Sequence, residues 1–468
     1  MIRERRNQTQ SILAKGIMMI FGANIINAVF NAVTNFALPT FLSIETYSGV
    51  KTYYLYLSYV GLLHLGYSDG VYLKYGGKKP EEVSLGTLRS DISTMRVFQI
   101  AIALLCIGIS AFVNDYAFFM CALTILPYNM AYFFRYYYQA VGEFKEYARI
   151  LNYTVVGTFA VNIILLLLHV FNDHRLYILF YYLVNTVIWL LVEINIKIKM
   201  KLSSWSFRYF SFDILKDNIE MGFFLMLGTF SSIVMTGMDR WFIKIFMDNN
   251  AFAYYSFAVS IEGLLNIAIT PVTTTMYNYF CNHREVSEVR RIKVNVFLLF
   301  SLIISTCFIA KCIICIFIPK YLESIQVLFI LFAAQLYFTY VRSIYVNLYK
   351  ADKRQNTYFR NLIIVIAIGA IFNYVLYCLL HTKEAFAIGT LLSAIVWYML
   401  SMMDMKDKSL DIKISTSMLL VIAIFLISGL TLSPFLGLAA FLFGVVCITL
   451  LFYRNECIGM YYRIRVFI

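Results

Sequence analysis

The chain has 468 residues, of which 61% are hydrophobic, 17% aromatic and only 14% charged. This composition excludes a soluble globular protein, because a soluble fold of this length needs more polar residues to cover its surface. The formal net charge of +13 does not indicate nucleic-acid binding, because the basic residues are scattered over short loops and gather on no single face. We therefore expect no nucleic-acid partner.

Apolar stretches along the chain are long enough to cross a bilayer, which takes about 20 residues in a helix. Lipid offers no partner for backbone N–H and C=O groups, so each stretch is expected to be helical. The sequence therefore predicts an all-α polytopic membrane protein with about 14 transmembrane helices. These segments are residues 16–38, 53–72, 93–113, 116–140, 150–170, 176–196, 219–246, 251–280, 294–318, 324–349, 361–380, 385–403, 414–432 and 435–453.

The positive charge of the loops predicts the orientation in the membrane. An even number of spans places both termini on one side, and 30 of the 39 Lys and Arg residues fall on that side. Positive residues in short loops are retained in the cytoplasm, so we expect both termini to be cytoplasmic. The first segment is too long for the core of a signal peptide and is expected to remain in the membrane.

The predicted outer loops are too short to hold an enzyme domain. Asn114 and Asp115 alone join the third and fourth segments, whereas membrane glycosyltransferases and oligosaccharide polymerases usually need a sizeable outer loop. The sequence contains no GxxxxGK[ST] loop and no HExxH, and its five His residues form no plausible Ser-His-Asp arrangement. We expect no enzyme activity, no catalytic or metal site and no cofactor.

A row of amides indicates that the first segment has a polar face. Residues three to four apart share one face of a helix, and such a face should avoid lipid. The four amides are those of Asn24, Asn27, Asn31 and Asn35. A shift of 205 residues maps them onto four polar positions of the seventh segment, which are Thr229, Ser232, Thr236 and Arg240.

A second match supports an internal duplication. An offset of 211 residues maps Tyr147, Arg149 and Asn162 onto Tyr358, Arg360 and Asn373. The sequence thus predicts two pseudo-symmetric six-helix bundles in the same orientation, a plan that recurs in transporters, although chance similarity among apolar helices is the alternative. The predicted domains are residues 1–200, residues 201–405, and residues 406–468 with two additional transmembrane helices and a cytoplasmic tail.

Arginines inside the apolar segments are the first candidate binding residues. Charge in the hydrocarbon costs about 2.5 to 3.5 kcal/mol on insertion scales, so it is retained where a cavity or partner compensates it. Arg135 and Arg342 lie in the fourth and tenth segments. They either snorkel to the cytoplasmic interface or bind a phosphate or pyrophosphate with their planar donors. The rings beside Arg135, among them Tyr136, either stack on sugars or form an interfacial belt.

Two acids are candidates for ion coupling. Glu262 lies near the middle of the eighth segment, where it either exchanges a proton or forms a static hydrogen bond or salt bridge, with Arg342 or Arg240 as possible partners. Asp239, beside Arg240, either takes part in ion coupling or caps the outer end of its helix in a local ion pair.

Two prolines interrupt long apolar helices. Pro127 and Pro271 each remove a backbone hydrogen bond and permit a kink. Each is a candidate hinge, or simply a kink in a helix that only packs.

Two stretches resemble a known family. They are FALPTFLSIETY at residues 36–47 and SYVGLLHLGYSDGVYLKYGG at residues 58–77, and the pair Asp239 and Arg240 also fits the pattern. The sequence resembles the bacterial polysaccharide flippases of the O-antigen and capsule type. These belong to the superfamily that also contains multidrug and toxin extruders and the lipid II flippase.

The resemblance implies a pair of six-helix bundles in the bacterial cytoplasmic (inner) membrane. It would move an undecaprenyl-pyrophosphate-linked oligosaccharide repeat unit from the cytoplasmic to the periplasmic leaflet by alternating access, driven by an ion gradient. The expected partners are this lipid-linked oligosaccharide, membrane lipids, and a glycan polymerase and chain-length regulator. We expect Arg135, Arg342 and Arg240 to contact the anion, and the amide face and Tyr136 to contact sugars. The alternatives are a cation-coupled multidrug extruder and a membrane glycosyltransferase or polymerase.

Overall fold

The computed structural model describes residues 22, 24–200, 207–282, 285–405 and 408–467. Among these residues every regular element is a helix, and 12 helices are long and apolar enough to cross a membrane. The prediction of an all-α polytopic membrane protein is confirmed. Two of the 14 predicted segments are not among these 12. The first is helical over residues 24–41, and the second is divided between two shorter helices.

The chain separates into two compact units, Met1–Val234 and Met235–Ile468. The division falls inside helix α8 (Phe212–Phe246), which continues unbroken from one unit into the other. The predicted domain boundaries at 200 and 405 adjoin residues 201–206 and 406–407, which lie outside the described residues. The three predicted domains therefore stay a prediction.

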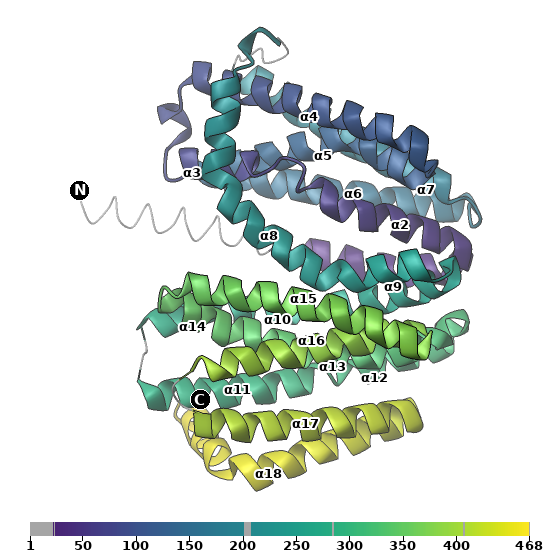
Figure 1. Ribbon diagram of the computed structural model, residues 1–468, viewed down its shortest axis with the longest axis vertical. Helices are drawn as coiled ribbons and strands as arrows, with labels where there is room; N and C mark the ends of the chain where they lie inside the picture. Colours follow the sequence, from purple (N-terminus) through teal and green to yellow (C-terminus); the bar gives the residue numbers. More distant parts are fainter. Residues whose placement is uncertain (1–21, 23, 201–206, 283–284, 406–407, 468) are drawn as a thin grey trace. The chain divides into compact units, whose positions relative to one another are not determined.

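The first unit contains the helix over residues 24–41, six further helices and the first part of α8 (Figure 1). Helix α5 lies at its centre and packs against five neighbours, α2, α3, α4, α6 and α7. The further helices are α2 (Ile44–Val60), α3 (Tyr67–Tyr75), α4 (Leu85–Val113), α5 (Tyr116–Ala140), α6 (Phe144–Leu167) and α7 (His174–Met200).

Polar side chains cap several helices at the ends predicted to face outward. Ser43 accepts a hydrogen bond from the Thr46 backbone N–H at the start of α2 (3.2 Å). Asp115 does the same for α5 (2.8 Å, from Ala117). These caps satisfy backbone donors that a helix start leaves without partners.

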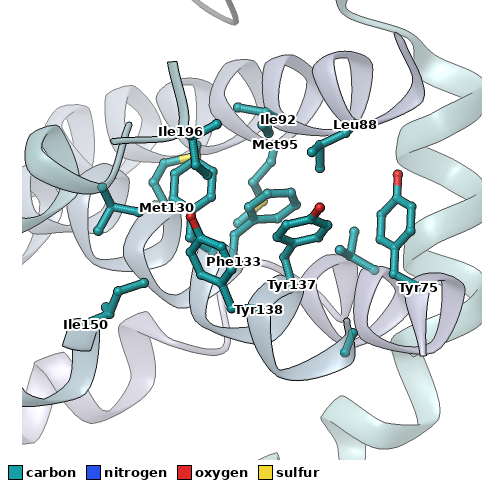
Figure 2. Close-up of a cluster of buried hydrophobic side chains, with 14 of the residues drawn as sticks. Tyr75, Leu88, Ile92, Met95, Met130, Phe133, Tyr137, Tyr138, Ile150 and Ile196 are labelled. Atoms are coloured by element: carbon teal, nitrogen blue, oxygen red, sulfur yellow. The ribbon is translucent and has the colours of Figure 1, made fainter. Parts of the chain in front are cut away.

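The core of the first unit lies around the second half of α5. Phe133 and Tyr137 are fully buried there, and Met95 of α4, Ile150 of α6 and Ile196 of α7 complete the cluster shown in Figure 2. Few residues of α4 and α6 are fully buried, and both helices have exposed apolar side chains, such as Leu105 and Leu167. Such surface is stable only against lipid, which explains why the unit is apolar outside as well as inside.

The second unit contains the end of α8 and ten further helices. Helix α13 is its buried centre and packs against α9, α10, α11, α12, α14, α16 and α17. The helices are α9 (Asn249–Gly263), α10 (Asn266–Asn282), α11 (Val286–Ile303), α12 (Thr306–Phe317), α13 (Ile325–Ser343), α14 (Tyr345–Ala351), α15 (Gln355–Leu380), α16 (Lys383–Met403), α17 (Lys408–Thr431) and α18 (Pro434–Phe467).

The last two helices, α17 and α18, lie side by side (Figure 1). A buried ion pair and contacts between aromatic rings join α17 to the other helices of the second unit. Lys293 of α11 donates to Asp411 of α17 (2.7 Å), and both side chains are buried. Phe425 of α17 packs edge-on against Phe308 of α12. Lys311 of α12 donates to the Gly429 backbone carbonyl (2.6 Å) near the end of α17.

The two units repeat the same packing. In the first, α5 packs against α2 and α7, and α6 packs on α7; in the second, α13 packs against α9 and α16, and α15 packs on α16. The turn after α5 in the first unit resembles the turn after α14, the short helix that follows α13, in the second. Gly142 and Lys353, which are 211 positions apart, both have a positive φ (76° and 56°). The next residue of each turn closes it with a matching bond, Glu143 N–H to the Tyr138 carbonyl and Arg354 N–H to the Tyr349 carbonyl.

The second membrane segment of each unit is broken in the middle. In the first unit α2 ends at Val60 and α3 begins at Tyr67, after a left-handed residue at Gly66 (φ 90°). In the second unit α9 ends at Gly263 and α10 begins at Asn266. The sequence predicted one continuous span in each place, because apolar composition is insensitive to a break whose backbone groups bond locally.

The break in the first unit permits unusually close packing between α3 and α8. A Cβ atom added at Gly222 of α8 would lie 2.0 Å from the Gly66 carbonyl oxygen and 2.3 Å from the Gly70 nitrogen. Asn218, one turn earlier on α8, donates to the buried carboxylate of Asp91 (3.1 Å), which also accepts from Lys74 of α3. The two backbones therefore touch, and a shared carboxylate ties them together.

We predict that Gly222→Ala destabilises the protein. Ala is normally favoured over Gly in a helix by roughly 0.5–1 kcal/mol, but the added methyl here meets backbone atoms that cannot move aside independently. Overpacking of this kind costs about 1–3 kcal/mol. The measurement is the thermal unfolding midpoint in detergent. Gly228→Ala in the same helix is the control, since its added Cβ meets nothing within 4 Å; equal midpoints for the two variants would contradict the prediction.

Candidate functional site

The first unit contains a cavity of about 460 Å³ beside the amide face of the first segment. Two of the four predicted amides, Asn31 and Asn35, line it, together with hydroxyl groups of α2 and α6. The lining residues are Phe30, Asn31, Thr34, Asn35, Leu38, Lys51, Tyr54, Leu57, Ser58, Tyr128, Thr154, Val155, Thr158 and Phe159. The polar face predicted from spacing therefore borders an open space.

The other two amides lie outside this cavity lining. Asn24 is exposed and Asn27 is half-buried. The side-chain oxygen of Asn27 is shielded and has no hydrogen-bond partner among the described residues. The structure thus divides the predicted row into an inner pair at the cavity and a pair nearer the start of the described chain.

Lys51 is the cation of this cavity, and sequence reasoning missed it. We predicted the second segment to begin at residue 53, which placed Lys51 in an outer loop, but α2 begins at Ile44 and carries Lys51 inside the helix. Its ammonium lies 5.1 Å from the ring centroid of Tyr47 and 5.9 Å from that of Tyr54. The spacing of these three residues on one helical face was the available signal.

A row of three tyrosines extends from the cavity along α5. Tyr128, Tyr132 and Tyr136 are one turn apart, and we call them the tyrosine row; Tyr128 also lines the cavity. The hydroxyls of Tyr132 and Tyr136 are hydrogen-bonded (2.9 Å). The Arg135 guanidinium lies 4.6 Å from the Tyr132 ring centroid, and the buried imidazole of His64 stacks on the same ring. Arg135 and Tyr136 are thus both in contact with Tyr132, and the predicted substrate contacts of Arg135 and Tyr136 stay a prediction.

In the second unit, Glu262 of α9 forms a hydrogen bond, and the sequence did not identify its partner. It accepts from the side-chain amide of Gln335 on α13, whose oxygen in turn accepts from Thr339 (3.3 Å). The guanidinium groups of Arg342 and Arg240 are close enough to interact electrostatically with the carboxylate. Glu262 thus lies within electrostatic range of both predicted arginines of this unit, and no direct ion pair joins it to either of them among the described residues.

Asp239 is fully provided with hydrogen-bond donors. The Tyr255 hydroxyl donates to it (2.5 Å), as do the Thr390 hydroxyl (3.3 Å) and the Arg240 backbone N–H (2.8 Å). Helix α8 continues to Phe246, so Asp239 lies inside the helix. The alternative in which Asp239 caps the helix end is wrong, because the carboxylate is buried against α9 and α16.

A void of about 10 Å³ adjoins Asp239. Thr390, Ser393 and Asn373 line it, and the side-chain oxygen of Asn373 is buried without a hydrogen-bond partner among the described residues. Oxygen atoms of this kind are the ligands that hard cations prefer. Tyr255 and Thr390 are partners of Asp239 that no local sequence signal revealed, because they come from two other helices, α9 and α16.

The two prolines differ in their effect on the backbone. Helix α5 continues through Pro127, which is buried. Pro271 lies inside α10, about one turn after the break between Gly263 and Asn266. Pro271 removes the hydrogen bond to the carbonyl four residues earlier, that of Ile267, which lies inside α10 and after the break. Hinge roles for both stay predictions.

Several other buried charges among the described residues form ion pairs within the protein, and we interpret these pairs as structural. Arg96 of α4 forms an ion pair with Glu193 of α7, and both side chains are almost fully buried. Lys74 and Asp91 form a second pair. Removing one member of such a pair leaves an uncompensated charge, which is strongly destabilising. These residues are therefore poor probes of function.

Comparison with solved structures places this arrangement in a known fold. The chain resembles a structure of the lipid II flippase MurJ in an inward closed conformation, with a TM-score of 0.67 and 14% identity, over 94% of this chain and 99% of that one. It also resembles an inward-facing multidrug resistance transporter of the MATE family, within the MOP superfamily, with a TM-score of 0.57 and 12% identity, over 80% of this chain and 94% of that one. No protein-family model and no curated protein matches the sequence. The likeness shows a shared fold.

We predict that water reaches the amide face of the cavity. In a variant lacking the nine native cysteines, Asn31→Cys should react with a hydrophilic maleimide in intact membranes, because Asn31 is exposed and lines the cavity. Val33→Cys is the control, since Val33 is also exposed but does not line the cavity. Equal labelling of the two positions would contradict a water-filled cavity.

Proposed function

We propose that this protein is a flippase for an undecaprenyl-pyrophosphate-linked oligosaccharide repeat unit, moved from the cytoplasmic to the periplasmic leaflet. The observation that carries the proposal is the cavity of the first unit, where amides, hydroxyls, a cation and aromatic rings line one space inside an apolar bundle. The shared fold with a lipid II flippase agrees with it. Substrates of this class combine an anion, sugars and an apolar tail, and the cavity offers a partner for the first two.

In this proposal the anion is bound by cations that lie at the cavity, along the tyrosine row and near Glu262. Lys51 lies at the cavity, and Arg135 lies along the tyrosine row. Arg342 and Arg240 provide a second group in the other unit. Planar guanidinium groups bind phosphate oxygens with paired hydrogen bonds, and a lysine adds a point charge.

Sugars are bound by the amides and the tyrosine row. The side chains of Asn31 and Asn35 each carry both a donor and an acceptor, which matches the hydroxyl groups of a sugar. Aromatic rings such as Tyr128 and Tyr136 offer flat apolar faces with a polar edge. Asn24 and Asn27 extend the same helical face beyond the cavity.

We propose that alternating access uses Pro127 and Pro271 as hinges and an ion gradient as the driving force. Glu262 is the residue that exchanges a proton, because a hydrogen bond from a neutral amide permits both of its charge states. Asp239 is the second candidate, as part of a cation site with Asn373 and Thr390. The protein would lie in the bacterial inner membrane with both termini cytoplasmic, near a glycan polymerase and a chain-length regulator.

A multidrug extruder is the second candidate function. It is favoured by the shared fold with a multidrug resistance transporter and by two acids, Asp239 and Glu262, in one unit. Deleting the gene separates the two functions. Loss of surface polysaccharide with unchanged drug sensitivity supports the flippase, whereas greater drug sensitivity with normal polysaccharide supports the extruder.

We predict that Lys51→Gln and Arg135→Gln each reduce flipping of a lipid-linked oligosaccharide at least about tenfold. A hydrogen bond to a charged group contributes about 1.5–3 kcal/mol, and 1.4 kcal/mol corresponds to roughly a factor of ten. The measurement is the transfer of labelled substrate between leaflets of reconstituted vesicles. Lys216→Gln is the control, because its side chain is 63% exposed. Wild-type rates in both test variants would exclude these cations from substrate binding.

We predict that Glu262→Gln removes most of the pH dependence of turnover. The substitution keeps an oxygen that can accept from Gln335 but cannot exchange a proton, so folding should be preserved. The measurement is the transport rate across a pH series in vesicles with a defined proton gradient, with Glu220→Gln as the exposed control. A wild-type pH profile would remove Glu262 from the coupling mechanism, and the same series with Asp239→Asn would then test the second candidate.

A further inference from the structure

A second large space of about 710 Å³ lies between α6 and α7 of the first unit. Its volume is in the range of small-molecule and cofactor sites. Most of its lining is apolar, and a small polar group lies at one end. The lining residues are Tyr138, Glu146, Arg149, Ile150, Tyr153, Val156, Gly157, Phe180, Leu183, Val184, Val187, Ile188, Leu191, Val192 and Asn195. We call this space the α6–α7 groove.

The α6–α7 groove is separate from the proposed transport cavity, although both use α6. The cavity is lined by Thr154, Val155 and Thr158, whereas the groove is lined by Tyr153, Val156 and Gly157. The lining of the groove contains none of the residues that line the cavity. A molecule in the groove would therefore contact the back of a helix that forms the cavity wall.

The apolar part of the groove opens onto the surface that faces lipid. Val187 is 52% exposed and Leu191 is 50% exposed, and both belong to a membrane-spanning helix. At its far end α6 and α7 approach closely, since a Cβ added at Gly157 would lie 3.0 Å from a methyl group of Val184. The groove is thus an apolar space between two closely packed helices, and its apolar lining is suited to an acyl chain.

The polar end of the groove is built around a buried carboxylate. Glu146 is 5% exposed and accepts from Arg149 (2.7 Å) and from the side-chain amide of Asn195 (3.4 Å). Both bonds from Arg149 to Glu146 come from the same nitrogen, Nη1. The Arg149 side chain is 35% exposed and its guanidinium carries five N–H donors, so donors outside the pair can reach a phosphate. Glu146 fixes the position of Arg149.

The length of the groove distinguishes two kinds of apolar ligand, the acyl chain of a phospholipid and a polyprenyl tail. From Glu146 to Gly157 it follows α6 for about 16 Å at 1.5 Å per residue. The hydrocarbon core is about 30 Å thick, so this length corresponds to one leaflet. The polar end lies near Phe144, where α6 begins, at the depth of lipid headgroups. An ordinary phospholipid chain matches this length, whereas a polyprenyl tail is several times longer than one leaflet.

We propose that the α6–α7 groove binds a glycerophospholipid of one leaflet, with an acyl chain between the two helices and its phosphate on Arg149. The bound lipid buttresses α6 from the side opposite the transport cavity. The site is part of this chain's structure and its occupancy does not depend on which substrate the cavity carries.

Native mass spectrometry of the purified full chain, titrated with phosphatidylglycerol, tests the proposal. We expect saturable binding of one lipid that is weakened about tenfold or more by Arg149→Gln, through loss of the charged hydrogen bond. Val187→Trp, which fills the exposed channel without touching the polar end, should weaken binding to a similar extent. Lys197→Gln is the control for the loss of a positive charge. Lys197 is an exposed cation on α7, the helix that carries Val187, and it does not line the groove.

Three outcomes would overturn the proposal. The first is equal phosphatidylglycerol binding by wild type, Arg149→Gln and Val187→Trp, which would place the bound lipid elsewhere. The second is no saturable binding by the wild type. The third is displacement of phosphatidylglycerol by undecaprenyl phosphate in the wild type but not in Val187→Trp, which would assign the groove to a polyprenyl tail. Thermal unfolding midpoints of the variants establish that each is folded.

Discussion

The structure depends on one constraint, that the bilayer provides no hydrogen-bonding partner for charged groups inside it. In the part of the chain that the structure describes, several buried charges outside the candidate site are accordingly paired with other groups of the protein. Arg96 pairs with Glu193 across α4 and α7, Lys293 pairs with Asp411 across α11 and α17, and Lys311 donates to carbonyl groups at the end of α17. These contacts specify which helices are neighbours, where van der Waals packing of apolar side chains in lipid discriminates little. They also explain why the C-terminal pair of helices belongs to the second unit.

The lack of hydrogen-bonding partners in the bilayer also bears on the cations of the candidate site. Lys51 and Arg135 lie against aromatic rings, and Arg240 and Arg342 lie near a carboxylate without the short ion pairs seen elsewhere among the described residues. Guanidinium groups in such settings keep N–H donors that can bind an anionic ligand. The paired charges stabilise the fold, whereas these four are proposed to bind substrate.

Both units are organised around one buried helix, α5 or α13, and this arrangement combines stability with function. One side of α5 forms the aromatic core around Phe133 and Tyr137, while the tyrosine row continues from the cavity on another side. Helix α13 likewise carries Gln335 and Arg342 within the most buried span of its unit. A rigid helix holds each binding residue at a fixed height. The broken segments α2–α3 and α9–α10 lie beside these helices and carry Lys51, His64 and Glu262.

The sequence by itself determined the class of the protein, the approximate spans and the internal repeat. Hydropathy and helical spacing are local properties of the sequence, and the bilayer requires apolar helices of a fixed length. The sequence also identified Asn31, Asn35, Arg135 and Glu262 as polar groups in unusual places. Only the tertiary structure decided their partners. In the structure Lys51 lines the cavity, whereas the sequence placed it in a loop. Asp239 accepts from Tyr255 and Thr390, and Arg96 forms an ion pair with Glu193. These partners come from helices far apart in the sequence, and which helices meet depends on the packing of the whole unit, which no local pattern encodes.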